Sequence, residues 1–399
     1  MSAFRWRDDA AASVGPLLVA DRGDEVHRVR AYARAVWSCL VEPGDGVAGA
    51  LIATLGPVHA LQVAMSVAGG AAGAGVSREQ LQQGRERWRP RLVAEAIAFA
   101  LETAAGTGIH LICPEDDVWP SALDDLGPHA PVCLWVRGDP ARLRQLDPAV
   151  AIVGARAASG YGEQIASEFA AALTGRGITV VSGAAYGIDG AAHRGALSAG
   201  GMTVALLAGG VDRPYPAGHS DLIDRIARTG AVIGELPCGN APTKWRFLQR
   251  NRLIAALGSA TVVVEAGARS GSLNTAGHAA DLGRALAAVP GPVTSGSSAG
   301  CHRLLREFDA RCVTTADEVA ELLGMGNAQD GMLAGPWTGD DTRLADALSG
   351  RAWRDVDDLA RRSGMAPDEI RSRLGLLALT GAVEGDGFRW RRAASRRTR

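Results

Sequence analysis

The residues best suited to bind an anion lie in one stretch, from Lys244 to Ala276. It opens with a cluster of cations and aromatic rings, which comprises Lys244, Trp245, Arg246, Phe247, Arg250, Asn251 and Arg252. An apolar run at 261–264 then predicts a buried strand. The small-residue turn Ser270-Gly271-Ser272 opens a predicted helix, whose free N–H groups suit a phosphate. Because arginine contacts phosphate through paired hydrogen bonds and aromatic rings stack on bases, the stretch indicates a nucleic acid strand as its ligand.

Lys244 is the only lysine in the chain, and arginine supplies the remaining non-histidine cations. A lysine kept in such a chain indicates a place where a compact ammonium group is preferred over a planar guanidinium. A structural interpretation of the same segment stays open. In it, Arg250 and Arg252 are ion-paired at the start of a helix and Trp245 is part of the core. The segment by itself does not decide between binding and packing.

The elements that must position this stretch follow an α/β pattern. Between residues 106 and 324, short apolar runs alternate with helical segments, which predicts parallel strands joined by right-handed crossovers. We therefore expect a doubly wound, Rossmann-like parallel sheet. The predicted strands are 150–153, 178–181, 203–207, 231–234, 261–264 and 284–289, with 311–313 as a seventh and with 109–113 and 131–136 leading into the domain.

Ligands of such a sheet bind at the carboxyl ends of its strands. Small residues follow several of these ends, among them Gly154 before Arg156 and the pair Ser182-Gly183, and they let a ligand approach the backbone. The first turn, 154–162, does not match the GxGxxG pattern, and no carboxylate follows the second strand to hold a ribose. Lys244 follows no glycine-rich phosphate loop. Nicotinamide and ATP chemistry are both disfavoured, and we expect no cofactor and no catalytic residue.

Two further regions flank the sheet domain. Residues 1–105 predict a small helical domain of the SAM or helix-hairpin type, whose glycine turns either contact phosphate or only connect packed helices. Residues 325–341 are rich in Gly, Asp and Asn and predict a linker. Residues 342–399 predict three helices, a hairpin and a tail, with six arginines from residue 389 on. This winged-helix pattern suits DNA contact and protein docking equally.

Composition limits the partners and the compartment. The net charge is −1, so a nucleic-acid site must be a local patch. The six cysteines form no CxxC pair and no His/Cys cluster has zinc spacing, so we expect no metal. The thiols are scattered, residues 1–10 lack an apolar signal core, and no apolar run approaches the ~18 residues of a membrane span. These features predict a cytoplasmic protein that does not bind membranes.

Several short motifs follow one another in a set order: Arg156, Ser182-Gly183, Gly187-Ile188-Asp189, Arg250-Asn251-Arg252 and Ser270-Gly271-Ser272-Leu273. Taken together they resemble the DNA-processing protein A family (DprA/Smf). The resemblance is dense over residues 109–323 and looser in the flanking domains, whose order agrees. Two positions depart from the family pattern, because the turn at Ala217 lacks the family's lysine and Leu248 replaces a proline.

The resemblance implies a protein that is not an enzyme. Such a protein binds and protects single-stranded DNA, loads the RecA recombinase onto it in recombination and natural transformation, and forms homodimers through its Rossmann-like domain. Family DNA contacts carry over to Arg156, Lys244 and Phe247. With the motif residues, the predicted DNA-binding set is Gly154, Arg156, Ser182, Gly183, Lys244, Phe247, Arg250, Asn251, Arg252, Ser270, Gly271 and Ser272.

Two alternatives remain. The first is a nucleotide phosphoribohydrolase of related architecture, in which Glu265, directly after the fifth strand of the alternating pattern, is the acting carboxylate. The structural interpretation of Glu265 is a buried acid that accepts backbone N–H bonds. The second alternative is a docking scaffold that binds only proteins and has no salt-dependent affinity for DNA.

Overall fold

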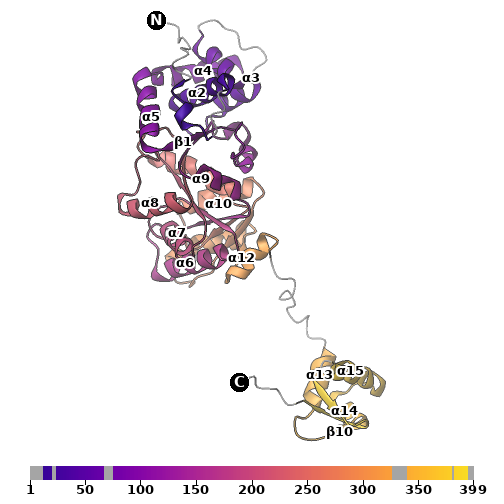
Figure 1. Cartoon of the computed structure of the whole chain (residues 1–399). Coiled ribbons are helices and arrows are strands. Elements are labelled where there is room, and N and C mark those ends of the chain that lie inside the picture. Colours follow the sequence, from indigo (N-terminus) through magenta and orange to yellow (C-terminus); the bar gives the residue numbers. More distant parts are fainter. Residues whose placement is uncertain (1–11, 20–23, 67–74, 326–338, 380–381, 394–399) are drawn as a thin grey trace. The chain divides into compact units, whose positions relative to one another are not determined.

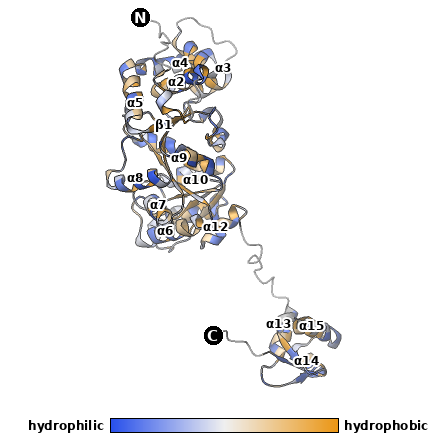
Figure 2. Cartoon of the chain, in the orientation of Figure 1, coloured by the Kyte–Doolittle hydropathy of each residue, from blue (hydrophilic) through white to orange (hydrophobic). Residues whose placement is uncertain are grey.

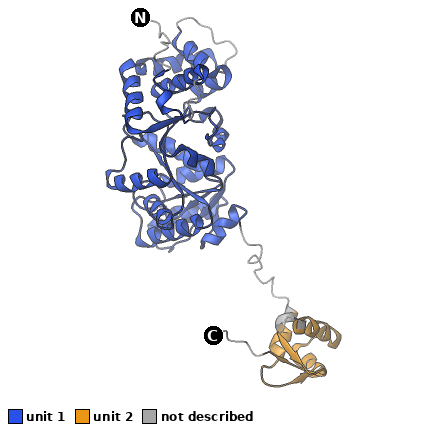
Figure 3. Cartoon of the chain, in the orientation of Figure 1, with its two compact units in different colours: residues 1–326 blue, residues 327–399 orange. Residues whose placement is uncertain are grey.

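The structure is a computed structural model that describes residues 12–19, 24–66, 75–325, 339–379 and 382–393. The chain divides into two compact units, Met1–Gly326 and Asn327–Arg399 (Figures 1 and 3). Most of the predicted linker, 325–341, and the end of the arginine-rich tail lie outside the described residues.

Unit 1 is built on a nine-stranded sheet with the order β1-β2-β6-β5-β4-β3-β7-β8-β9. The strands from β6 to β9 are parallel, whereas β1 and β2 pair antiparallel at one edge. The predicted doubly wound parallel sheet is thereby confirmed. The strands are β1 (Ile109–Ile112), β2 (Leu134–Gly138), β3 (Ala149–Val153), β4 (Thr179–Ser182), β5 (Thr203–Leu207), β6 (Ala231–Gly234), β7 (Ala260–Val263), β8 (Ala285–Ala288) and β9 (Arg311–Cys312).

The strand order reverses beside β3. The chain moves outward from β3 through β4 and β5 to β6, and then returns to pair β7 with the free side of β3. The crossover that makes this return contains helix α9 (Lys244–Leu257), so the predicted cationic cluster is one continuous helix that begins at Lys244. Such a switch point is the usual ligand site of an open α/β sheet.

Helices cover both faces of the sheet. Alternate residues of a strand point to opposite faces, and in β3 Val150 and Ile152 join one core cluster while Ala151 and Val153 join another. Both faces are apolar because both are buried, and Figure 2 shows mostly apolar colours along the central strands. The helices of this layer are α6 (Gly160–Thr174), α7 (Ile188–Ser198), α8 (Ser220–Thr229), α9, α10 (Ser272–Asp281), α11 (Ala299–Glu307) and α12 (Ala316–Leu322).

The N-terminal helices share a core with one edge of the sheet. Trp37 of α2 and Trp88 of α4 pack edge to face with their ring centroids 5.2 Å apart, and the same cluster includes Trp135 of β2. The separate helical domain predicted for residues 1–105 stays a prediction. The helices are α2 (Glu25–Leu40), α3 (Gly46–Met65), α4 (Arg78–Trp88) and α5 (Ala94–Thr107).

Helix α3 is the one helix in the described ranges that is long and apolar enough to cross a membrane. Length and composition are weak grounds, because core helices of soluble proteins meet the same criteria. The helix is interrupted at Gly56, where φ is +76° and Pro57 follows. Leu51 and Leu61, on either side of this break, are buried in the core shared with the sheet.

Unit 2 is the predicted winged helix. Its core is formed by Leu344, Leu359, Ile370 and Leu374 with their neighbours. A three-stranded sheet with the order β10-β12-β11 supplies the wing. The elements are α13 (Gly339–Ala347), β10 (Arg354–Asp355), α14 (Val356–Ser363), α15 (Pro367–Leu379), β11 (Val383–Gly385) and β12 (Arg389–Arg392).

Candidate nucleic-acid interface

A pocket of about 840 Å³ lies at the switch point of the sheet. Its walls are the loop after β3, the first half of α9, and the turn that leads into α10. Three predicted residues, Ser182, Gly183 and Arg252, do not line it. The predicted residues that do line it are Gly154, Arg156, Lys244, Phe247, Arg250, Asn251, Ser270, Gly271 and Ser272.

Phe247 is the centre of a stack of rings and guanidinium groups. The guanidinium carbon of Arg156 lies 4.4 Å from its ring centroid and that of Arg250 lies 5.7 Å away. The ring of Tyr215 is tilted against it at 5.7 Å. Since Arg156 already covers Phe247, a base that stacks there must displace or share this guanidinium. Tyr215, 48% exposed, offers a more open ring that the sequence analysis did not select.

Exposed cations surround this stack. Lys244 is the first residue of α9, which is capped by Thr243, whose hydroxyl accepts from the Arg246 N–H at 3.3 Å. Arg269 lies in the loop before α10 and also lines the pocket, although the sequence analysis did not include it. The sequence feature that could have identified Arg269 is its position directly before Ser270, at the start of the predicted phosphate-binding turn. Arg156, Lys244 and Arg269 make no ion pair with any described residue, so their charges remain available to an anion.

Arg250 contributes charge from within the wall. It is 5% exposed, and its Nη1 donates to the carbonyl of Leu206 at 2.5 Å. Burial lowers its pKa to about 10, although the nearby carboxylate of Asp189 opposes this shift. Burial likewise raises the pKa of Asp189, against the attraction of Arg250. The Asp189 carboxylate accepts from the N–H of Gly183 at 3.2 Å, which ties the second-strand motif to this pair.

Ser182 and Gly183 do not line the pocket but support residues that do. The hydroxyl of Ser182 is fully buried and donates to the carbonyl of Ile152 at 2.6 Å. A Cβ on Gly183 would lie 2.0 Å from Arg250 Nη1, so the missing side chain makes room for that guanidinium. The close approach that we expected for a ligand at this glycine is made by Arg250.

Arg252 is occupied by a structural ion pair. Its two terminal nitrogens donate to the carboxylate of Glu235 at 2.8 and 2.7 Å, and its Nε donates to the carbonyl of His129 at 3.0 Å. Both members of the pair are buried. The structural interpretation of the cluster, in which its arginines are ion-paired, therefore holds for Arg252. It does not hold for Trp245, which is 57% exposed and is not a core residue.

Asn251 connects α9 to the turn before α10. Its Nδ2 donates to the carbonyl of Gly271 at 3.3 Å and to Asn274 Oδ1 at 3.2 Å. The hydroxyls of Ser270 and Ser272 lie 2.7 Å apart across the turn. Gly271 is exposed, so its amide is open to the pocket. The next N–H groups of α10 are engaged within the turn, since Ser272 donates to the Ser270 hydroxyl at 3.4 Å and Leu273 donates to the Ser270 carbonyl at 3.2 Å.

Glu265 lies outside this pocket and is engaged as an acceptor on both oxygens. Oε2 accepts from the Ser159 N–H at 2.8 Å, and Oε1 accepts from the hydroxyls of Ser159 at 2.6 Å and Ser297 at 3.2 Å. Glu265 as a whole is 4% exposed. This arrangement fixes the start of α6, since Ser159 also caps that helix through Gly162. The geometry favours the structural interpretation over a catalytic one.

The fold and the pocket define an α/β protein with a cationic, aromatic-lined site at the topological switch point. The chain belongs to the family of DNA recombination-mediator protein A, whose family model matches residues 110–324. A second model, the DprA winged helix domain, matches residues 328–386.

Individual relatives agree with this assignment. A DprA protein of Mycobacterium tuberculosis is 44% identical over 90% of this chain and 94% of its own length. Protein Smf of Escherichia coli is 35% identical over 71% of this chain and 78% of its own. The X-ray structure of DNA processing protein A from Streptococcus pneumoniae matches 73% of this chain and 97% of its own, with a TM-score of 0.59 and 30% identity.

Proposed function

We propose that the pocket around Phe247 binds single-stranded DNA. The observation that carries this proposal is the set of three exposed, unpaired cations, Arg156, Lys244 and Arg269, grouped around the rings of Phe247 and Tyr215. Cations in a groove hold the phosphates of a strand, and aromatic rings hold its bases by stacking. In a duplex the base faces are already stacked on one another, so ring contacts favour a single strand.

The remaining predicted residues are assigned roles through these contacts. The amide of Gly271 at the start of α10 is placed to bind a phosphate. Asn251 holds that turn against α9. Arg250 adds charge to the wall and supports the ring of Phe247.

The decisive measurement is fluorescence anisotropy with a labelled oligo-dT and with a duplex of equal length, at several salt concentrations. Three phosphate contacts predict a log–log salt slope of about −2, at ~0.7 per contact on a single strand. Replacing Arg156 and Lys244 together by alanine should weaken binding and flatten the slope by about 1.4. An unchanged affinity of the double variant, or a preference for the duplex, contradicts the proposal.

We further propose that the protein is a cytoplasmic homodimer that associates through its Rossmann-like domain, residues 106–324. In this form it protects the bound strand and loads RecA onto it, in recombination and in natural transformation. The description of the family as a recombination mediator supports this role. RecA filament assembly on DNA covered by single-strand-binding protein should accelerate when the protein is added. Light scattering should give twice the chain mass. A protein that binds the strand but leaves RecA assembly unchanged would limit the function to protection.

The docking-scaffold alternative is tested by the same titration. A scaffold that binds only proteins shows no salt-dependent affinity for the oligonucleotide, whereas the exposed cations of the pocket require one.

A further inference from the structure

The arginines of unit 2 fall into two groups, those that are paired with carboxylates and those that are not. On the helices, Arg361 and Arg362 pair with Asp358, and Arg371 pairs with Asp368. Three arginines make no ion pair with any described residue, and all three are exposed: Arg351, Arg389 and Arg392. Each of them lies on β12 or in the loop before β10, so the free positive charge of the unit is on its wing.

These free arginines are spread along β12. Arg389 is the first residue of the strand and Arg392 is the last. The N–H of Arg392 donates to the carbonyl of Ser349 at 3.0 Å, and the Ser349 hydroxyl accepts from the N–H of Arg351 at 3.2 Å, so Arg351 lies beside the end of the strand. The guanidinium of Arg392 contacts only a neutral group, the carbonyl of Ala345. Because a strand rises about 3.3 Å per residue, the charges extend over roughly 10 Å, which suits an extended anion.

The charges of unit 2 are sorted between its sheet and its helices. Over the described residues of the unit, arginines and carboxylates balance at ten each. Residues 349–355 and 383–393, which contain the wing, hold five arginines and three carboxylates, whereas residues 356–379, which contain α14 and α15, hold four of each. The chain continues through residues 394–399 with three more arginines and no carboxylate. The sheet side of the unit is therefore its positive side.

The three carboxylates of the wing are engaged by neighbouring groups. Asp355 accepts from a backbone N–H at the start of α14, and Asp386 accepts from the N–H of Arg389, each at 2.7 Å. Glu384 is paired with Arg391 at 2.6 Å. None of the three is paired with a free arginine, so the wing attracts an anionic partner.

An exposed ring stands at the tip of the hairpin formed by β11 and β12. Phe388 is 86% exposed, the largest value for an aromatic side chain in the described ranges. Asp386 accepts from its N–H at 3.0 Å, which fixes the turn. Trp353, the other exposed ring among the described residues of unit 2, is covered by the guanidinium of Arg391 at 4.6 Å. Successive bases of a single strand need several open rings, whereas one apolar wedge beside arginines is what proteins insert into the minor groove of a duplex.

Helix α15 is unsuited to reading DNA. In helix-turn-helix proteins the first residues of the recognition helix contact base edges in the major groove. The first turn of α15 contains Asp368 and Glu369, which repel phosphates. Its two arginines add no free charge, because Arg371 is paired with Asp368 and Arg373 is paired with Glu369. The wing is therefore the better contact for DNA.

We propose that unit 2 binds duplex DNA through its wing, with Phe388 inserted at a base step of the minor groove and the free arginines on the flanking phosphates. These contacts read groove shape and backbone, so binding should not depend on sequence. The site shares no residue with the pocket around Phe247 and does not depend on the function proposed there. Non-specific contacts of this kind give a Kd of about 10⁻⁴–10⁻⁶ M at physiological salt, so the duplex remains the weaker ligand of the chain.

The test uses the full chain and a labelled duplex of about 20 base pairs, titrated by anisotropy at several salt concentrations. Arg389→Gln should weaken binding at low salt and flatten the log–log salt slope by about 0.9, the value of one phosphate contact on B-DNA. Arg371→Gln removes the same charge from α15, where the side chain is 59% exposed, and is the matched control that should bind the duplex like the wild type. Oligo-dT binding should be the same in all three proteins.

Two substitutions of Phe388 test the wedge. Phe388→Ala should weaken duplex binding, whereas Phe388→Leu should retain most of it, because leucine also serves as a wedge and does not stack as a ring. A readout independent of affinity is the bend of the duplex, measured by energy transfer between dyes at its two ends. The wild type should bend the duplex by about 20–90°, and Phe388→Ala at saturation should leave it straight.

The proposal is overturned if Arg371→Gln weakens duplex binding as much as Arg389→Gln, since α15 then makes the contact, or if neither substitution has an effect. It is also overturned if the wing variants weaken oligo-dT binding and not duplex binding, because the occupant is then a single strand. A failure of the proposed function is seen separately, when the Arg156 and Lys244 double variant binds oligo-dT like the wild type.

Discussion

A methyl group added at Gly183 tests whether the packing of Arg250 against this glycine stabilises the pocket wall. A Cβ at this glycine would lie 2.0 Å from Arg250 Nη1 and 2.5 Å from Arg250 Cζ. The φ of Gly183 is not positive, so the backbone itself accepts alanine. Arg250 has little room to withdraw, because it is buried and its Nη1 is bonded to the carbonyl of Leu206. Gly183→Ala is therefore a steric change directed at one guanidinium.

The expected cost follows from overpacking. Inserting a methyl group into a packed wall destabilises by about 1–3 kcal/mol, because neighbours must leave their preferred positions. The displaced guanidinium also loses its bond to Leu206 and its place 5.7 Å from Phe247. We expect the free energy of unfolding to fall by about this amount, and oligo-dT binding to weaken at the same time.

Urea denaturation and anisotropy measure the two effects. Gly160→Ala, where no heavy atom lies within 4 Å of the added Cβ, is the control and should match or slightly exceed the stability of the wild type. Arg250→Met removes the clashing group, so adding Gly183→Ala to it should cost much less than in the wild type. An equal cost in both backgrounds would show that the clash with Arg250 is not the cause.

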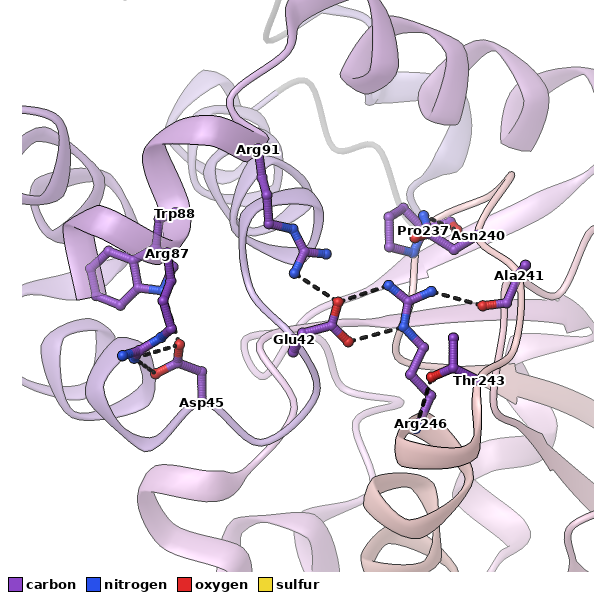
Figure 4. A network of polar contacts seen from close by, with 10 residues as sticks. All are labelled: Glu42, Asp45, Arg87, Trp88, Arg91, Pro237, Asn240, Ala241, Thr243 and Arg246. Carbon is purple, nitrogen blue, oxygen red and sulfur yellow. Dashed lines mark hydrogen bonds and ion pairs between the residues drawn. The ribbon is translucent and has the colours of Figure 1, made fainter. Parts of the chain in front are cut away.

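Three further substitutions test the assignments around the pocket. Arg252→Ala leaves Glu235 buried without its partner and should destabilise the protein by about 3–5 kcal/mol in urea denaturation. The control Arg303→Ala, on the exposed face of α11, should leave stability unchanged. Equal effects of the two substitutions would show that the buried ion pair does not stabilise the fold. Two guanidinium groups bind Glu42 and outweigh the effect of burial, so its pKa is lowered from the ordinary value of 4.5 (Figure 4). Its contribution to stability is therefore present above pH 4.5 and is lost as the pH falls below that value. Glu42→Gln should therefore reduce the acid sensitivity of thermal unfolding between about pH 5 and 3. An unchanged pH profile would contradict a stabilising role of the ionised Glu42. Neither the wild type nor Glu265→Gln should release free base from a nucleoside monophosphate in a chromatographic assay, and a release that this substitution abolishes would restore the enzyme alternative.

The sheet could be predicted because its signal is local. Strands buried on both faces appear as short runs of apolar, often β-branched residues, and the helices between them have their own periodicity. The runs at 203–207 and 231–234 coincide with β5 and β6. The antiparallel pairing of β2 with β1 and β6 could not be derived in this way. The direction of an edge strand depends on which strand of the folded sheet it pairs with, and a local pattern does not contain that information.

The position of the pocket could be predicted from the sequence, but its lining could be predicted only in part. Arg250 and Arg252 are two residues apart and look alike in the sequence, yet one lines the pocket and the other is held by Glu235 behind it. Arg269 was missed because an isolated arginine in a loop has no periodic signal. Tyr215 precedes the third helix of the pattern and reaches the pocket only through the fold.

The sequence by itself determined the α/β class, the winged helix and the segment from Lys244 onward that lines the site, because propensity, periodicity and turn chemistry act over a few residues. The tertiary structure decided which cations are free and which are paired. Burial and partners are set by elements far apart in the chain, as in the contact of Arg246 with Glu42. It also decided that Trp245 is exposed in a groove beside the N-terminal helices, because the rotation of α9 about its axis is set by what it packs against.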